Sequence, residues 1–73
     1  PERLLAREGL LRSYARAVQQ GLAKLGFDPG PVDGAVGPMT REAIRAYQTS
    51  QGVAVTGEIS KPLLASINTA SGL

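Results

Sequence analysis

Carboxylates are the main side chains in this 73-residue sequence that could do chemistry, since His, Cys and Trp are all missing. The acidic residues are Glu2, Glu8, Asp28, Asp33, Glu42 and Glu58. A glycosidase needs two carboxylates about 5 to 10 Å apart across a cleft. Asp28 and Asp33 could come that close, but a domain of this length offers little cleft in which either could act as a general acid. The sequence therefore predicts a protein that is not an enzyme.

Metal binding is equally poorly supported by the residue types. Zinc sites draw mainly on His and Cys, and neither is present. Asp33-Gly34 has a faint likeness to a calcium-binding loop, but the further Asp or Asn ligands at two-residue spacing are missing. We therefore expect no metal and no cofactor.

Asp33-Gly34 belongs to a stretch that occurs twice. "PVDGAVGPMTREAI" (residues 31–44) aligns without a gap with "AVTGEISKPLLASI" (residues 54–67) at an offset of 23 residues. The matched pairs are Val32 with Val55, Gly34 with Gly57, Val36 with Ile59, and Ile44 with Ile67. Glycine suits a turn position of positive φ, and Asp33 or, more weakly, Thr56 can accept backbone N–H groups inside such a turn. The pattern favours two turns of one geometry, so that any ligand would occupy a groove that the turn creates.

The elements that hold these turns are predicted to be helices. Apolar residues recur at helical spacing before the first turn, at Leu4, Leu11, Ala15, Val18, Leu22 and Leu25. Gly9 and Gly21 interrupt this pattern, each at a cost of about 1 kcal/mol relative to Ala. The spacing predicts a helix over residues 13–25 that ends at Gly26. Whether the residues before it extend the helix or form a separate short turn is left open.

Two further helices are predicted after the first turn. Ala43, Ile44 and Tyr47 give residues 40–49 an apolar stripe, and Gly52 ends that helix. "VAVTGEI" is typical of a very short strand or extended segment. Ser60 is then a good N-cap for a third helix, whose apolar face includes Leu63, Leu64 and Ile67, and residues 69–73 are expected to form a frayed tail. The predicted fold is all-α: a compact three-helix bundle with two glycine-containing loops related by an internal pseudo-repeat.

Composition bounds the remaining possibilities. The chain is a single small domain, 42% hydrophobic, with eight Lys or Arg against six acids and a net charge of +2. No apolar run approaches the 18 or so residues that cross a membrane, and no secretory signal is present. Because the chain starts at Pro1 without a Met, we interpret it as a piece of a longer protein whose targeting signal lies elsewhere.

With these features the sequence resembles the small three-helix peptidoglycan-binding domain found beside many bacterial cell-wall enzymes. The resemblance covers residues 15–68, preceded by an extension or linker over residues 1–14. It is carried by Gln19, Leu22, Leu25-Gly26-Phe27, Val32-Asp33-Gly34, Gly37, Thr40, Ala43, Tyr47-Gln48, Gly52 and Val55-x-Gly57. The chain departs from the family at "KPLL", where an aromatic or Thr is usual, and at Thr56, where Asp is frequent.

The resemblance implies binding of bacterial peptidoglycan (murein), by its stem peptide and adjacent sugar, without catalysis. Such a module anchors a larger envelope protein or cell-wall enzyme, so the expected location is periplasmic or extracellular and the expected state monomeric. The alternative is a docking or structural module of the same fold without wall affinity, whose partner is the catalytic or another domain of the parent protein or another envelope protein. A helix-turn-helix that binds nucleic acid is disfavoured, because the connection from Gly52 to Ser60 exceeds the usual turn.

The candidate binding residues are Phe27, Asp33, Thr40, Arg45, Tyr47 and Gln48. They are predicted to border a shallow groove between the "FDPGPVDG" loop and the second helix. Tyr47 either stacks on the ligand or is a core aromatic, and Gln48 either bonds the ligand or ties a neighbouring loop; for both we favour the structural role, and Phe27 is expected in the core. Arg45 either pairs with a stem-peptide carboxylate or lies on a solvated face, and the helix start at Thr40 offers N–H groups to an anion.

Overall fold

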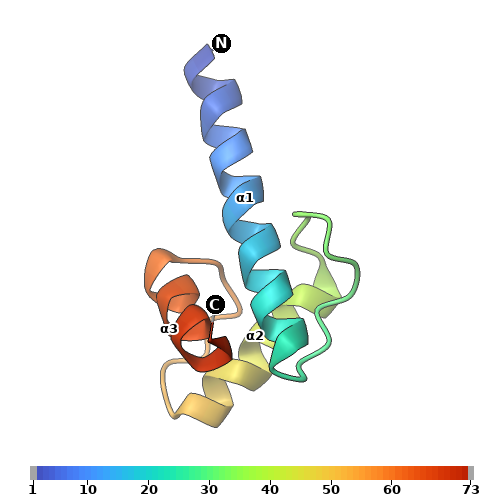
Figure 1. The fold of residues 1–73 in the computed structure, drawn as a ribbon, viewed down its shortest axis with the longest axis vertical. Helices are drawn as coiled ribbons and strands as arrows, with labels where there is room; N and C mark the ends of the chain where they lie inside the picture. Colours follow the sequence, from blue (N-terminus) through green and yellow to red (C-terminus); the bar gives the residue numbers. More distant parts are fainter. Residues whose placement is uncertain (1, 73) are drawn as a thin grey trace.

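The computed structural model describes residues 2–72 of the chain, and side chains from residue 12 onward. Within this range it forms α1 (Glu2–Lys24), α2 (Pro38–Gln51) and α3 (Lys61–Ser71) and no strand (Figure 1). α1 packs against α3 and, less extensively, against α2. The predicted all-α three-helix fold is confirmed, and the "VAVTGEI" segment forms no strand.

α1 is one continuous helix from Glu2, so the residues before Ser13 extend the predicted helix and do not form a separate turn. Its N-terminal half projects beyond the other two helices, and its C-terminal half lies against them (Figure 1). The projecting half accounts for the elongated outline of the molecule, which measures 39 × 22 × 21 Å.

The helix ends follow local signals in the sequence. α1 and α2 both end in a Schellman motif: the N–H of Phe27 donates to the carbonyl of Leu22, and that of Val53 to the carbonyl of Gln48. Ser60 caps α3 by accepting the N–H of Leu63 at 3.1 Å. α2 starts two residues earlier than predicted, at Pro38, because proline is well suited to the first helical position. α3 continues to Ser71, so residues 69–71 are helical where a frayed end was expected.

The core forms where the three helices meet. Its buried members are Val18, Leu22, Ala43, Ile44, Tyr47, Leu63 and Ile67. At the crossing of α1 and α3 the two helices touch closely, because the Cγ2 methyl of Ile67 occupies the space that a Cβ on Gly21 would need. Gly21 is thus a packing residue, and the helix tolerates its low propensity for the sake of this contact.

Candidate functional site

Two buried glutamines hold the two loops of the protein. In the first loop (residues 25–37), the side-chain oxygen of Gln19 accepts the N–H groups of Asp33 and Gly34 at 3.1 and 2.9 Å. Its amide nitrogen donates to the carbonyl of Ala35 at 2.9 Å and to Thr40 Oγ1 at 3.1 Å. Gln19 is fully buried. A buried amide with all these bonds made fixes the loop onto α1 and α2.

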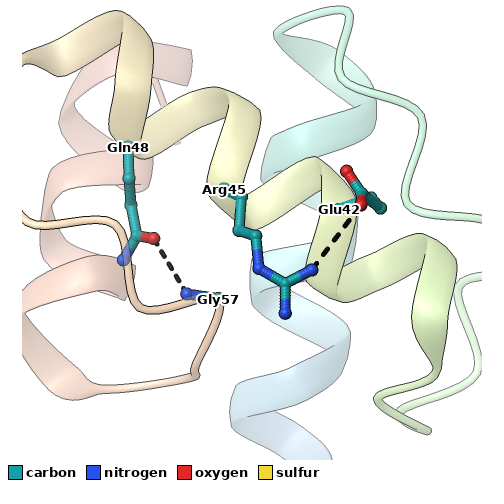
Figure 2. A network of polar contacts seen from close by, with 4 residues as sticks. All are labelled: Glu42, Arg45, Gln48 and Gly57. Carbon is teal, nitrogen blue, oxygen red and sulfur yellow. Dashed lines mark hydrogen bonds and ion pairs between the residues drawn. The ribbon is translucent and has the colours of Figure 1, made fainter.

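Gln48 repeats this arrangement in the second loop (residues 52–60). Its side-chain oxygen accepts the N–H groups of Thr56 and Gly57 at 2.9 and 3.0 Å, and its amide nitrogen donates to Thr56 Oγ1 at 3.0 Å. Figure 2 shows the bond between Gln48 and Gly57. Of the two roles left open for Gln48, the structure shows the loop-holding one.

The turns themselves match the sequence repeat. Gly34 and Gly57 both have positive φ, 81° and 69°, a conformation that side chains disfavour. Asp33 Oδ1 accepts the N–H of Ala35 at 2.8 Å, and Thr56 Oγ1 accepts that of Glu58 at 3.2 Å. Asp33 and Thr56 therefore accept equivalent backbone hydrogen bonds in the two turns, and the bond to the Asp33 carboxylate is the shorter one.

The hydrogen bond from the N–H of Ala35 is the main reason why the pKa of Asp33 lies below its ordinary value of 3.8. The amide of Gln19, the backbone N–H of Asp33 and the charge of Arg12 act in the same direction, and partial desolvation opposes them. A carboxyl group whose pKa is lower in the folded state than in the unfolded state stabilises the fold above the unfolded pKa. That contribution disappears as the pH falls through the folded pKa.

We accordingly expect the difference in unfolding free energy between wild type and Asp33→Asn to be constant above about pH 5 and to shrink below about pH 4. Urea unfolding of both proteins between pH 7 and pH 2 measures it. If the unfolding free energies of the two proteins fell in parallel at acid pH, this role of Asp33 would be contradicted.

Thr40 and the two core aromatics are engaged inside the protein. Thr40 is buried, and its hydroxyl donates to the carbonyl of Pro29 at 2.8 Å. Tyr47 is only 2% exposed and shares a hydrogen bond with Ser66 Oγ across α2 and α3. The ring of Phe27 meets that of Tyr47 edge-on, with centroids 5.8 Å apart. Tyr47 is thus a core aromatic, the alternative favoured above.

Arg45 lies on the exposed side of α2, next to the second loop. Its Nη1 is 3.6 Å from a carboxylate oxygen of Glu42, and its side chain covers the backbone at Gly57, as Figure 2 shows. An exposed ion pair at this distance is weak. Arg45 therefore has donors left for a ligand, but on α2 it lies beside the second loop and not beside Asp33.

The described surface of α2 and its loops includes three hollows that bear on the predicted site. The first-loop pocket has a volume of about 260 Å³ and is lined by Pro29, Pro31, Asp33, Ala35, Met39 and Thr40. The inter-loop pocket, also about 260 Å³, is lined by Val36, Arg41, Gly57, Glu58 and Ile59. The second-loop pocket, about 290 Å³, is lined by Tyr47, Gln48, Val53, Thr56, Leu63 and Ser66 among others.

The six predicted site residues are thus distributed over several places. Asp33 and Thr40 share the first-loop pocket, which lies between the "FDPGPVDG" loop and α2 as the sequence predicted for the groove. Tyr47 and Gln48 face the second-loop pocket, while Arg45 and Phe27 line none of the three. The single groove bordered by all six is therefore divided, because α2 turns successive residues to different faces.

Sequence reasoning missed the residues that line the pockets with exposed side chains, above all Met39, Arg41 and Glu58. It also missed the loop-holding role of Gln19. A signal for Gln19 was present: it follows Val18 on the buried face of a helix, where an amide requires internal partners.

No group of three or more acidic side chains that could hold a metal ion occurs within the described residues. No helix in the same part of the chain is long and apolar enough to cross a membrane.

Comparison with known proteins identifies the family. The model of the family described as "Putative peptidoglycan binding domain" matches residues 12–67. Searches of curated proteins and of solved structures found no match to this chain. The family match covers all of α2, both loops and both loop-holding glutamines. The chain therefore belongs to the peptidoglycan binding domain family.

Proposed function

We propose that this domain binds the stem peptide and adjacent sugar of peptidoglycan in the first-loop pocket, without catalysis, and thereby anchors a larger protein in the bacterial cell envelope. The observation that carries the proposal is the pocket's construction. Gln19 fixes the loop from within, so the pocket is preformed and little conformational entropy is lost when a ligand binds.

The chemistry of the pocket suits an acetylated sugar and a short peptide. Its lining combines prolines and Met39, which is 52% exposed, with the start of α2. Apolar surface of this kind packs against sugar rings and acetamido methyl groups. The N-cap of α2 is Gly37, which has no side chain to bond the first-turn N–H groups, and such groups favour carbonyl or carboxylate oxygens.

A pocket this shallow supports weak binding, with a dissociation constant of about 10 μM to 1 mM. Weak sites are sufficient on a polymer such as the murein sacculus, because other contacts of the same protein raise the effective affinity. The periplasmic or extracellular location follows from this ligand.

Met39→Glu is expected to weaken binding to insoluble sacculi by about tenfold or more, since it places a charge in an apolar pocket. Co-sedimentation at several salt concentrations, with soluble muropeptides as competitors, measures the effect. The matched control is Val53→Glu, in the second loop. Val53 is 56% exposed, so this substitution makes the same change in net charge as Met39→Glu at a position of similar exposure. Both positions are exposed enough for the variants to fold.

The opposite pattern, in which Val53→Glu loses binding and Met39→Glu retains it, would move the site to the second-loop pocket and contradict the proposal. A wild-type protein that is folded but stays in the supernatant would favour the docking module with no wall affinity.

A further inference from the structure

The inter-loop pocket is separate from the pocket proposed above and is built from both halves of the sequence repeat. Its apolar surface comes from Val36 and Ile59, which occupy the same position in the two copies. Both side chains are half-buried. Because glutamines anchor both loops to the helices, the two aliphatic side chains are held in place in the lining of the same pocket.

Charges of opposite sign border this apolar surface. Arg41 contributes a guanidinium from α2, and Glu58 contributes a carboxylate from the second loop. The two do not pair with each other, and neither side chain has an ion-pair or hydrogen-bond partner among the side chains that the structure describes. Within the described part of the chain, the pocket therefore presents an unpaired cation and an unpaired anion beside an aliphatic surface.

We propose that the inter-loop pocket binds an α-amino-α-carboxylate head group carried on an alkyl chain. Arg41 donates to the ligand carboxylate, for which the planar guanidinium is well shaped. Glu58 accepts N–H groups from the ligand ammonium, and the alkyl chain lies on Val36 and Ile59. A diaminopimelate residue of a stem peptide carries such a head group, so the inference, which rests on the proposed function, assigns to this pocket the free end of that side chain.

Arg45 strengthens the preference for the carboxylate end. It lies one turn after Arg41 on α2 and covers Gly57, which lines the pocket. Its charge is partly balanced by Glu42. The cationic side of the pocket is therefore the α2 side, and the anionic side is the second loop, which fixes the orientation of the ligand.

The test uses free norleucine, which has the head group and the alkyl chain but no other part of peptidoglycan. Titration of the ¹⁵N-labelled domain should shift the backbone amides of Val36, Arg41 and residues 57–59, with a dissociation constant of about 1 to 10 mM. N-acetylnorleucine lacks the ammonium and norleucine amide lacks the carboxylate. Each should bind about three- to fivefold more weakly, the factor that an exposed ion pair contributes.

Two substitutions test whether Arg41 and Glu58 bind the charged groups of the ligand. Arg41→Gln and Glu58→Gln should each weaken norleucine binding by the same factor and should reduce pelleting with diaminopimelate-containing sacculi. Lys61→Gln and Asp28→Asn are the controls, because they make the same charge changes at exposed positions that do not line the pocket. All four residues are exposed, so the variants are expected to fold.

Shifts confined to other residues, or equal binding of norleucine and its two blocked derivatives, would overturn the proposal. The proposal would also be overturned if the Arg41 and Glu58 variants lost norleucine binding but still pelleted with sacculi like the wild type. The pocket would then not bind the stem peptide. If the wild-type domain does not pellet with sacculi, the proposed function is contradicted. The pocket is tested separately, because the norleucine titration contains no peptidoglycan.

Discussion

Gln19→Leu is expected to lower the free energy of unfolding by about 2 to 4 kcal/mol. Leucine fills nearly the same volume, so the loss comes from hydrogen bonds and not from a cavity. The substitution leaves the N–H groups of Asp33 and Gly34 and the carbonyl of Ala35 without their partner. Gly34 is buried, and water cannot replace the lost bond there.

Urea unfolding followed by circular dichroism measures the effect, with the slope m compared between variants. Gln20→Leu is the matched control, because Gln20 is the next residue of α1 and is exposed. It should change the unfolding free energy by less than about 0.5 kcal/mol. Equal stability of the two variants would show that Gln19 does not hold the first loop. If Gln19→Leu remains folded, it should also bind sacculi more weakly, because the first-loop pocket loses its fixed shape.

Gly21→Ala is expected to destabilise the domain by about 1 to 3 kcal/mol, although alanine is the better helix former. The new Cβ would collide with the Cγ2 methyl of the fully buried Ile67. A β-branched side chain on a helix has essentially one χ1 rotamer, so Ile67 cannot swing away. The helices α1 and α3 must separate instead.

A double-mutant cycle isolates this contact. Ile67→Leu removes the branch at Cβ while keeping the volume, a change that usually costs less than about 1.5 kcal/mol. In that background Gly21→Ala should be close to neutral or stabilising. If Gly21→Ala stabilises the protein with Ile67 in place, the close contact is wrong.

Gly21 and the repeated turns show which parts of the fold could be predicted from the sequence and which could not. Helical spacing, the Ser60 cap and the stops at Gly26 and Gly52 are local signals, and they placed three helices correctly. Gly21 was interpreted only as a cost to α1, because its partner Ile67 is distant in sequence and belongs to another helix. The repeat around Gly34 and Gly57 predicted the shared turns, since it compares two loops with each other.

The candidate site was less predictable for the same reason. Choosing residues by type gathered Arg45, Tyr47 and Gln48 into one groove with Asp33. Sequence shows which side chains could bind a ligand but not whether the protein already uses them. Tyr47 and Gln48 are both engaged internally, whereas Arg41 and Glu58 were not chosen as binding residues, because nothing in the local pattern distinguishes them from solvated charges.

The two buried glutamines have a consequence for how this domain can diversify. In each loop their oxygen accepts only main-chain N–H groups. The exposed side chains nearby, such as Val32, Val53 and Val55, have no part in that anchoring. Loop sequences can therefore be exchanged at these positions while the backbone stays in place. The fold separates the residues that maintain its shape from the exposed residues of its loops, which makes it a scaffold whose loop surfaces can be evolved or engineered without rebuilding the core.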